Sequence, residues 1–283
     1  MLDWNDLHHF VVLAREGTLS AAARALRVDH ATVARRIAAL EAAVALKLVD
    51  RRARHYALTD DGKRIAATAR AMEDIAFAVE RAMLASKPGI GGQVSISAPP
   101  SLANALIAPR LIALRRRHPN ILIRLIGEKR SASLTRREAD LALRLSRPAE
   151  PGLVARKIGH FGFGLYGAPA YLKDTPQHSF AFIAYDESME DAPQQQWLKM
   201  VAGKRDIVLR TSDLENQAAA ARAGVGLAAL PHFLGDGDSG LERYRTNQKP
   251  VGRDVWLVVH RDIRHAPAVR AVMEFLAGCM RRQ

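Results

Sequence analysis

The sequence predicts an α/β protein in which an all-helical N-terminal region precedes a larger region of alternating strands and helices. Three observations carry this prediction. Apolar residues recur at helical spacing through residues 4–83, a proline- and glycine-rich break follows at residues 87–92, and strand-like alternation starts at Gln93. We therefore expect an N-terminal domain at residues 1–59, a linker helix over residues 60–88, and a second domain at residues 89–283.

Residues 18–45 are predicted to form two short helices that meet at a tight turn. Thr18 or Ser20 can cap the first helix and Asp29 the second, because their side-chain oxygens accept hydrogen bonds from N–H groups that lack partners in a first helical turn. A preceding helix over residues 4–16 is expected to support the pair. This arrangement is typical of a helix-turn-helix DNA-binding domain.

The second helix of the pair is the expected DNA-reading helix. Its apolar residues recur at steps of three and four, which leaves His30, Thr32, Arg35 and Arg36 on the other side. Residues near the start of such a helix contact base edges in the major groove, and arginines bind guanine or phosphate. The sequence leaves the division between these roles open. A merely solvated polar face is the alternative, which the combination of turn, caps and apolar face disfavours.

Residues 46–58 are predicted to form two short strands with a basic tip, which would make the domain a winged helix-turn-helix. Cationic side chains on such a tip suit phosphates or the minor groove, where they strengthen binding more than they specify sequence. The complete set of expected DNA contacts is Thr18, Ser20, His30, Thr32, Arg35, Arg36, Arg51, Arg52 and Arg54.

The linker helix carries an apolar stripe that needs a partner. Thr59 can cap this helix, and apolar residues then repeat at steps of four and three. Packing against its own domain is one reading, but no neighbouring helix in the sequence supplies a matching face, so self-association is favoured. The stripe consists of Ile65, Ala69, Met72, Ala76, Val79 and Met83.

The N-terminal motifs resemble those of LysR-type transcriptional regulators over residues 1–88. The likeness is carried by LHHFVVLAREGTLSAAARAL, VDHATVARRIAALE and LTDDGKRI. One departure is Asp29-His30, where many members have Ser-Gln or Ser-Pro, and this change concerns base preference rather than fold. The resemblance implies a homodimer or homotetramer bound to an interrupted palindromic operator in double-stranded DNA, with RNA polymerase as a further partner.

Composition sets bounds on the remaining possibilities. A chain of 283 residues with 48% hydrophobic content can form two well-packed domains. The net charge of +13 suits a polyanion, although residues 1–88 carry only +3 of it. Cys279 is the only cysteine, so neither an intrachain disulfide nor a metal site is expected. No signal peptide or membrane span is visible, and we expect a cytoplasmic protein.

Strands and helices alternate after residue 92, which is typical of an α/β domain with a largely parallel sheet. Expected strands are 93–98, 121–126, 141–145, 162–166, 207–210, 224–230 and 255–260, and expected helices are 102–117, 213–223 and 268–280. This part resembles the LysR-type effector domain through VSISAPPSLANALIAPRLIALRRRHPNILI, ADLALRL and SDLENQAAAARAGVGLAALP. The resemblance implies a periplasmic-binding-protein-like fold of two α/β subdomains, residues 93–163 with the last helix and residues 166–258, around a ligand.

Several expected strand ends and helix starts provide candidate effector-binding residues, because open α/β sheets bind ligands outside the carboxyl ends of their strands. These residues are Pro100, Ser101, Leu102, Gly127, Glu128, Ser146, Arg147, Thr211 and Ser212. Ser101 and Ser212 are equally well explained as helix caps, and Arg147 as a solvated charge. If Arg147 binds ligand, the effector is a carboxylate. Phe161 and Phe163 are expected in the core or hinge, and no other cofactor is implied.

Two other classes of protein fit the sequence less well. One is an α/β enzyme fused to a DNA-binding domain, but the sequence shows no catalytic or phosphate-binding motif of the GxxxxGK[ST], HExxH or GxSxG type. His8 and His9 fall on successive helix faces without a carboxylate at helical spacing, so they do not indicate a metal site. An architectural DNA protein would not need the second domain. The sequence thus favours a non-enzymatic transcriptional regulator that binds DNA and a small-molecule effector.

Overall fold

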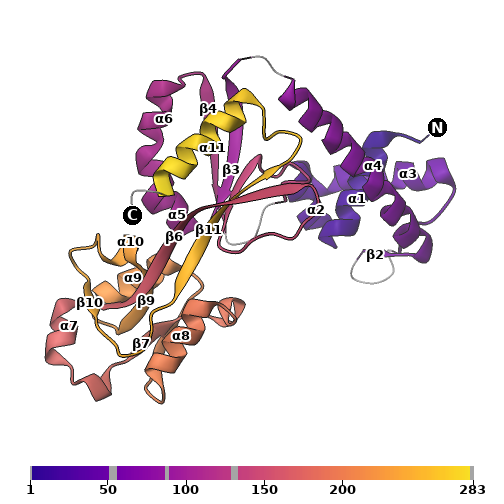
Figure 1. Cartoon of the computed structure of the whole chain (residues 1–283). Helices are drawn as coiled ribbons and strands as arrows, with labels where there is room; N and C mark the ends of the chain where they lie inside the picture. The colour runs from indigo at the N-terminus through magenta and orange to yellow at the C-terminus, as the bar shows by residue number, and fades with distance from the viewer. Residues whose placement is uncertain (1, 51–55, 87–88, 129–132, 281–283) are drawn as a thin grey trace. The chain divides into compact units, whose positions relative to one another are not determined.

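The computed structural model describes residues 2–50, 56–86, 89–128 and 133–280, and the chain divides into two compact units, residues 1–83 and 84–283 (Figure 1). The first unit holds three helices, a short two-stranded wing and most of a long helix. The second holds a large mixed sheet with helices on it. This architecture confirms the predicted α/β fold class with its all-α winged helix-turn-helix, linker helix and two-part effector domain.

The first unit begins with α1 (Trp4–Glu16), α2 (Leu19–Leu26) and α3 (His30–Val44). Each helix end has a local cause. Gly17 adopts φ 75° after α1, where its N–H bonds to the Leu13 carbonyl. Thr18 Oγ1 accepts the Ala21 N–H at 3.1 Å, and Asp29 Oδ1 accepts the Thr32 N–H at 2.6 Å. The predicted helix boundaries and caps are therefore confirmed.

The wing is joined to α3 by a buried carboxylate. Strands β1 (Val49–Asp50) and β2 (Ala57–Leu58) pair antiparallel. Glu41, near the end of α3, is only 4% exposed, and its Oε1 accepts the N–H groups of Leu48 at 2.9 Å and Val49 at 3.1 Å. This pair of hydrogen bonds fixes the approach to β1. The expected tip residues Arg51, Arg52 and Arg54 lie outside the described residues.

The predicted apolar stripe on helix α4 (Asp60–Ala85) is buried in its first part and exposed in its second. Ile65 and Ala69 pack against the core of the first unit, so for them packing within the domain is correct. Further along, Met72, Val79 and Met83 are 44%, 50% and 64% exposed. The exposed part of the stripe therefore starts at Met72, about two turns after the predicted start at Ile65, and Ile75, which is absent from the predicted stripe, belongs to it at 64% exposed.

The sheet of the second unit has two parallel parts. One contains β3 (Gly92–Ala98), β4 (Ile121–Gly127) and β5 (Leu141–Arg144), with β3 parallel to both neighbours. The other contains β7 (Phe182–Ala184), β8 (Ile207–Arg210) and β9 (Leu227–Pro231), with β7 parallel to both neighbours. The strand order is β4-β3-β5-β11-β6-β9-β7-β8, and β10 (Glu242–Tyr244) pairs with β6.

Two antiparallel strands join these parts (Figure 1). Strand β6 (Leu153–Gly167) pairs with β11 (Gly252–His260) over its first two thirds and with β9 over Phe163–Tyr166. The sequence predicted only residues 162–166 of β6, because the segment before them was interpreted as rich in turns. The expectation of a largely parallel sheet holds within each part but fails at these connecting strands.

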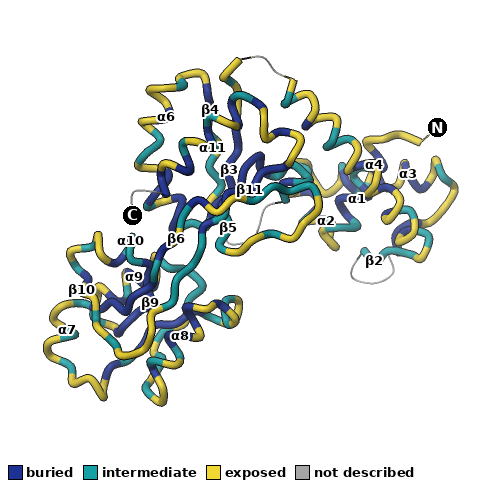
Figure 2. Tube along the Cα trace, viewed as in Figure 1, coloured by how far each residue is buried: buried dark blue, intermediate teal, exposed yellow. Residues whose placement is uncertain are grey.

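The helices of the second unit cover its sheet. Helical residues 100–117 change from α5 (Pro100–Leu102) through a π turn at Ala103–Ile107 to α6 (Leu111–Arg117), since Pro109 has no N–H to donate. The remaining helices are α7 (Pro169–Asp174), α8 (Pro193–Ala202), α9 (Leu214–Arg222), α10 (His232–Gly235) and α11 (Pro267–Met280). Figure 2 shows β3 and β9 among the most buried elements. No helix in the described ranges is long and apolar enough to cross a membrane.

Candidate functional site

The first half of α3 presents two exposed residues of the predicted DNA-contacting set, His30 and Arg35. Val33, Ile37 and Leu40 form the buried face of this helix and are at most 1% exposed. Arg35 lies on the side away from that face, and His30 is exposed as the first residue of the helix, so both are accessible in its N-terminal half. This is the part of a reading helix that contacts base edges.

The other predicted contacts have additional structural roles. Thr32 Oγ1 donates to Asp29 Oδ2 at 3.1 Å, so its hydroxyl belongs to the cap of α3. Arg36 Nη1 donates to Asp6 Oδ1 at 3.1 Å, which links α3 to α1. Thr18 caps α2, and Ser20 lies exposed in its first turn. DNA contact by these four residues stays a prediction.

The sequence reasoning overlooked two small apolar residues beside His30. Val28 in the turn is 36% exposed, and Ala31 in the first turn of α3 is also exposed. Apolar side chains at such positions can contact the methyl group of thymine. Only their position at the start of the helix could have indicated such a contact, because apolar residues next to a buried face are normally predicted to belong to the core.

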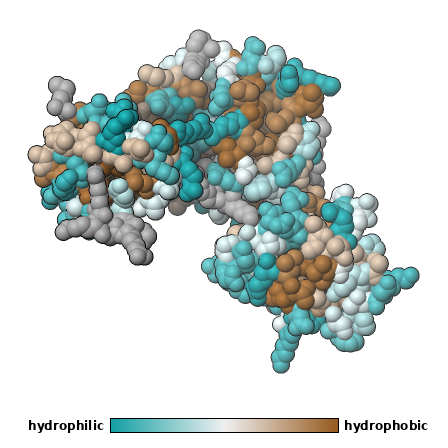
Figure 3. Space-filling view, turned by 180° about the vertical axis from the view of Figure 1, so that it is seen from behind, coloured by the Kyte–Doolittle hydropathy of each residue, from teal (hydrophilic) through white to brown (hydrophobic). Residues whose placement is uncertain are grey.

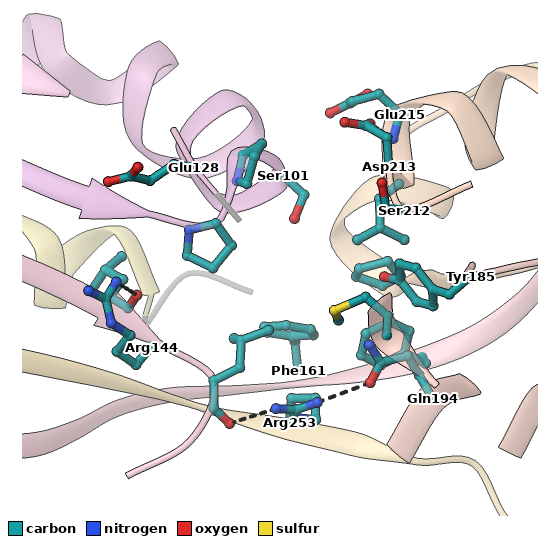
Figure 4. A pocket seen from close by; sticks show the side chains of 18 of the residues that line it. Ser101, Glu128, Arg144, Phe161, Tyr185, Gln194, Ser212, Asp213, Glu215 and Arg253 are labelled. Carbon is teal, nitrogen blue, oxygen red and sulfur yellow. Dashed lines mark hydrogen bonds between the residues drawn. The ribbon is translucent and has the colours of Figure 1, made fainter. Parts of the chain in front are cut away.

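A cavity of about 420 Å³ lies in the second unit, between the two parts of its sheet. One wall comes from the start of α5, the end of β4 and the segment after β5, with Ser101, Glu128 and Ser146. The facing wall comes from α8 and the start of α9, with Gln194 and Ser212, and Arg253 of β11 lies on the floor (Figure 4). Cavities of this size suit small ligands.

The structure places five of the nine predicted effector residues on this cavity, namely Pro100, Ser101, Glu128, Ser146 and Ser212. The other four do not line it. Leu102 is fully buried in the core, and exposed Gly127 ends β4. Arg147 turns toward Trp256, with its guanidinium carbon 5.6 Å from the ring centre, and Thr211 Oγ1 accepts the Asp213 N–H at 3.3 Å.

The sequence analysis missed the cavity residues that come from mid-chain strands and helices. Arg144, Tyr185, Gln194 and Arg253 all line the cavity. Phe161 and Phe163, expected in the core or hinge, are 6% and 1% exposed and also form its apolar wall. Ring contacts link this wall to the fold, since Phe161 lies 5.6 Å from Phe163 and 5.0 Å from Phe233 between ring centres.

The two guanidinium groups of the cavity differ in their surroundings. Burial lowers the pKa of Arg144, while the carboxylates of Glu128 and Glu150 oppose this shift. Burial also lowers the pKa of Arg253, and the opposing influence there comes from Tyr185. Burial raises the pKa of Tyr185 to about 12, so this phenol is neutral at pH 7. The cavity therefore holds one cation with carboxylates nearby and one whose near neighbours are neutral.

Comparison with known protein families gives two matches. The model described as "Bacterial regulatory helix-turn-helix protein, lysR family" matches residues 4–63, and "LysR substrate binding domain" matches residues 87–280. The second match alone covers more than half of the chain. The chain belongs to the LysR family of transcriptional regulators.

Two transcriptional activators are similar to this chain over most of its length. The Mau operon transcriptional activator of Paracoccus denitrificans is 25% identical over 282 residues, which cover 98% of this chain and 96% of the relative. The AhcY transcriptional activator HvrB of Rhodobacter capsulatus is 30% identical over 240 residues and 80% of each chain. The predicted family and its function, regulation of transcription through a DNA-binding and an effector-binding domain, are confirmed.

Solved LysR-family structures have the same fold. Full-length AphB of Vibrio cholerae superposes with a TM-score of 0.66 at 24% identity, over 98% of this chain and 99% of AphB. CrgA of Neisseria meningitidis superposes with a TM-score of 0.59 at 24% identity, over the full length of both chains. These likenesses show that the fold is shared over nearly the whole of each chain.

Proposed function

We propose that this LysR-type regulator binds an interrupted palindromic operator as a homodimer or homotetramer, and that a small molecule in the cavity modulates operator binding or promoter activation. The observation that carries the proposal is the cavity between the two parts of the sheet, lined from both sides and floored by the half-buried Arg253. The exposed residues at the start of α3 supply the DNA-reading surface. The protein acts in the cytoplasm, where its partners are operator DNA and RNA polymerase.

Assembly is supported by the exposed part of the α4 stripe. Met72, Ile75, Val79 and Met83 recur at steps of three and four, so they share one helix face, and each is at least 44% exposed. Exposed apolar faces of this kind mark protein interaction sites. Figure 3 shows apolar patches on the surface of the second unit. Ile112 and Leu122 of this unit are 56% and 63% exposed. These additional surfaces support a tetramer.

Modulation requires a ligand that distinguishes two states of the effector domain, because a ligand with equal affinity for both shifts neither population. The cavity meets this requirement through its construction. Its walls belong to different parts of the sheet that are joined by β6 and β11. A ligand that contacts both walls binds most tightly to the state in which the distance between the walls matches its size.

The direct test is to select operator fragments from random DNA with the full-length protein and to map them by footprinting. The proposal predicts an enriched sequence with two-fold symmetry, protected by a dimer or tetramer. Recovery of sequences without a shared motif, or protection by a monomer, would contradict it.

A further inference from the structure

Arg253 holds a fixed position on the cavity floor. Its Nη1 donates to Gln194 Oε1 at 3.1 Å and its Nη2 donates to the carbonyl oxygen of Leu145 at 3.1 Å (Figure 4). Gln194 belongs to α8, which packs on the β7 and β9 part of the sheet, and Leu145 follows β5 in the other part. The guanidinium is thus oriented before any ligand arrives.

Both acceptors of Arg253 are neutral, which leaves its charge without a matching anion. In the described part of the chain, no carboxylate forms an ion pair with it. Arg144 differs from Arg253, because the carboxylates of Glu128 and Glu150 interact with its guanidinium and raise its pKa against the effect of burial. A half-buried cation held by neutral dipoles favours an incoming anion, since a hydrogen bond to a charged acceptor is stronger than one to a neutral acceptor.

The donors of Arg253 match a carboxylate. A guanidinium has five N–H donors in a planar fork, and the two bonds to Gln194 and Leu145 use two of them. Three donors remain, and a carboxylate accepts two in parallel. The rest of the cavity is mainly apolar, with Leu143, Phe161 and Leu214 among its lining residues.

The opposite wall disfavours a second negative charge on the ligand. Asp213 caps α9, with its Oδ1 accepting the Glu215 N–H at 2.9 Å, and Glu215 follows in the first turn. Both acidic residues line the cavity, and Figure 4 shows them on the side away from Arg253. The positive end of α9 therefore already has two carboxylates beside it, and an anionic group there meets like charge.

We infer that the cavity takes a small monocarboxylate with an apolar body, whose carboxylate pairs with Arg253 while its body contacts the phenylalanine wall. This inference rests on the proposed function and names the ligand class of the same site. It also assigns the anion to Arg253 rather than to Arg147, which stacks on Trp256 outside the cavity.

Calorimetric titration of the full-length protein with matched probes tests the inference. Phenylacetate and hexanoate are the monocarboxylates, phenylacetamide and hexanamide are their neutral counterparts, and adipate is the dianion of hexanoate length. We expect at least one monocarboxylate to bind, and its amide and adipate to bind at least tenfold more weakly. Equal affinity for acid and amide, tighter binding of adipate, or no binding by either monocarboxylate at millimolar concentration would overturn the inference.

Variants assign the effect to one side chain. Arg253→Gln is expected to weaken monocarboxylate binding at least tenfold, and Arg253→Lys, which keeps the charge, less. The control is Arg156→Gln, since Arg156 is exposed on β6 and outside the cavity. Unchanged affinity in a folded Arg253→Gln protein, or equal losses in Arg253→Lys and Arg253→Gln, would overturn the assignment. Operator binding without ligand, measured in parallel, separates failure of this inference from failure of the proposed function.

Discussion

The proposed DNA-reading surface and the proposed effector cavity are built in opposite ways. His30 and Arg35 take their positions from a single helix, whose N-cap and buried face are neighbours in the sequence. The cavity draws its walls from segments between Pro99 and Arg253, which the sheet order brings together. A local site depends on a few nearby contacts, whereas a site assembled from distant segments depends on the whole domain. Without ligand, a substitution in one site is therefore expected to leave the structure of the other intact.

The largest effect is expected from Glu41→Ala, which removes the carboxylate that joins α3 to the wing. Two buried N–H groups, those of Leu48 and Val49, lose their acceptor. An unsatisfied buried donor costs roughly 1–3 kcal/mol, so the first unit should lose about 3 kcal/mol of unfolding free energy. Urea unfolding followed by circular dichroism measures this loss, and the second unit should unfold as in the wild type.

Lys47→Ala is the matched control for Glu41→Ala. Lys47 Nζ lies 3.4 Å from Glu41 Oε2, but its side chain is 79% exposed, and exposed ion pairs contribute little. Its removal should leave the unfolding curve nearly unchanged. Equal losses in the two variants would show that the ion pair, and not the backbone acceptor, stabilises the junction.

A smaller effect is expected when charges are placed on the exposed stripe of α4. The double variant Met72→Asp, Val79→Asp should raise the dimer dissociation constant by roughly 30-fold or more, which corresponds to about 2 kcal/mol at a central interface position. Sedimentation velocity over a concentration series measures it. Ala67→Asp is the control, because Ala67 is exposed on another face of α4. A double variant that remains dimeric would remove α4 from the interface.

The smallest effect is expected from a chain of hydrogen bonds around His232 in the second unit. Arg243 Nη2 donates to His232 Nε2 at 3.2 Å, and His232 Nδ1 donates to the Tyr166 hydroxyl at 2.9 Å, which in turn donates to Asp236. Burial and then Arg243 lower the pKa of His232, and Asp236 opposes them. The imidazole is thus neutral when folded and takes up a proton more readily when unfolded.

The sign of the pH dependence follows from this difference. The unfolded chain binds the additional proton below about pH 6.5, so the second unit should lose stability as the pH falls below that value. Arg243→Leu removes one cause of the lowered pKa and should make this loss shallower. Urea unfolding at pH 7.5 and pH 5.5 compares the two proteins. Identical pH dependence in both would remove Arg243 from the chain of contacts that controls His232.

The same contrast explains what could be predicted from the sequence. Local sequence was sufficient to predict the caps Thr18 and Asp29 and the buried face of α3, because each depends on neighbours within four residues. Helix α8 was missed because it begins with Pro193 and three glutamines, of which Gln195 is buried with its Oε1 accepting the Tyr185 N–H at 3.0 Å. Arg253 was missed because only the pairing of β11 with β5 and β6 brings it to the cavity.

Operator binding by the Arg35→Ala and Arg253→Gln proteins tests the separation of the two sites most directly. Fluorescence anisotropy with the selected operator gives both affinities without ligand. Loss of a base contact costs roughly 1–3 kcal/mol, so Arg35→Ala should bind roughly 5- to 150-fold more weakly, while Arg253→Gln should bind like the wild type. Wild-type affinity in Arg35→Ala, or an equal loss in Arg253→Gln, would contradict a DNA-reading site on α3 that is independent of the cavity.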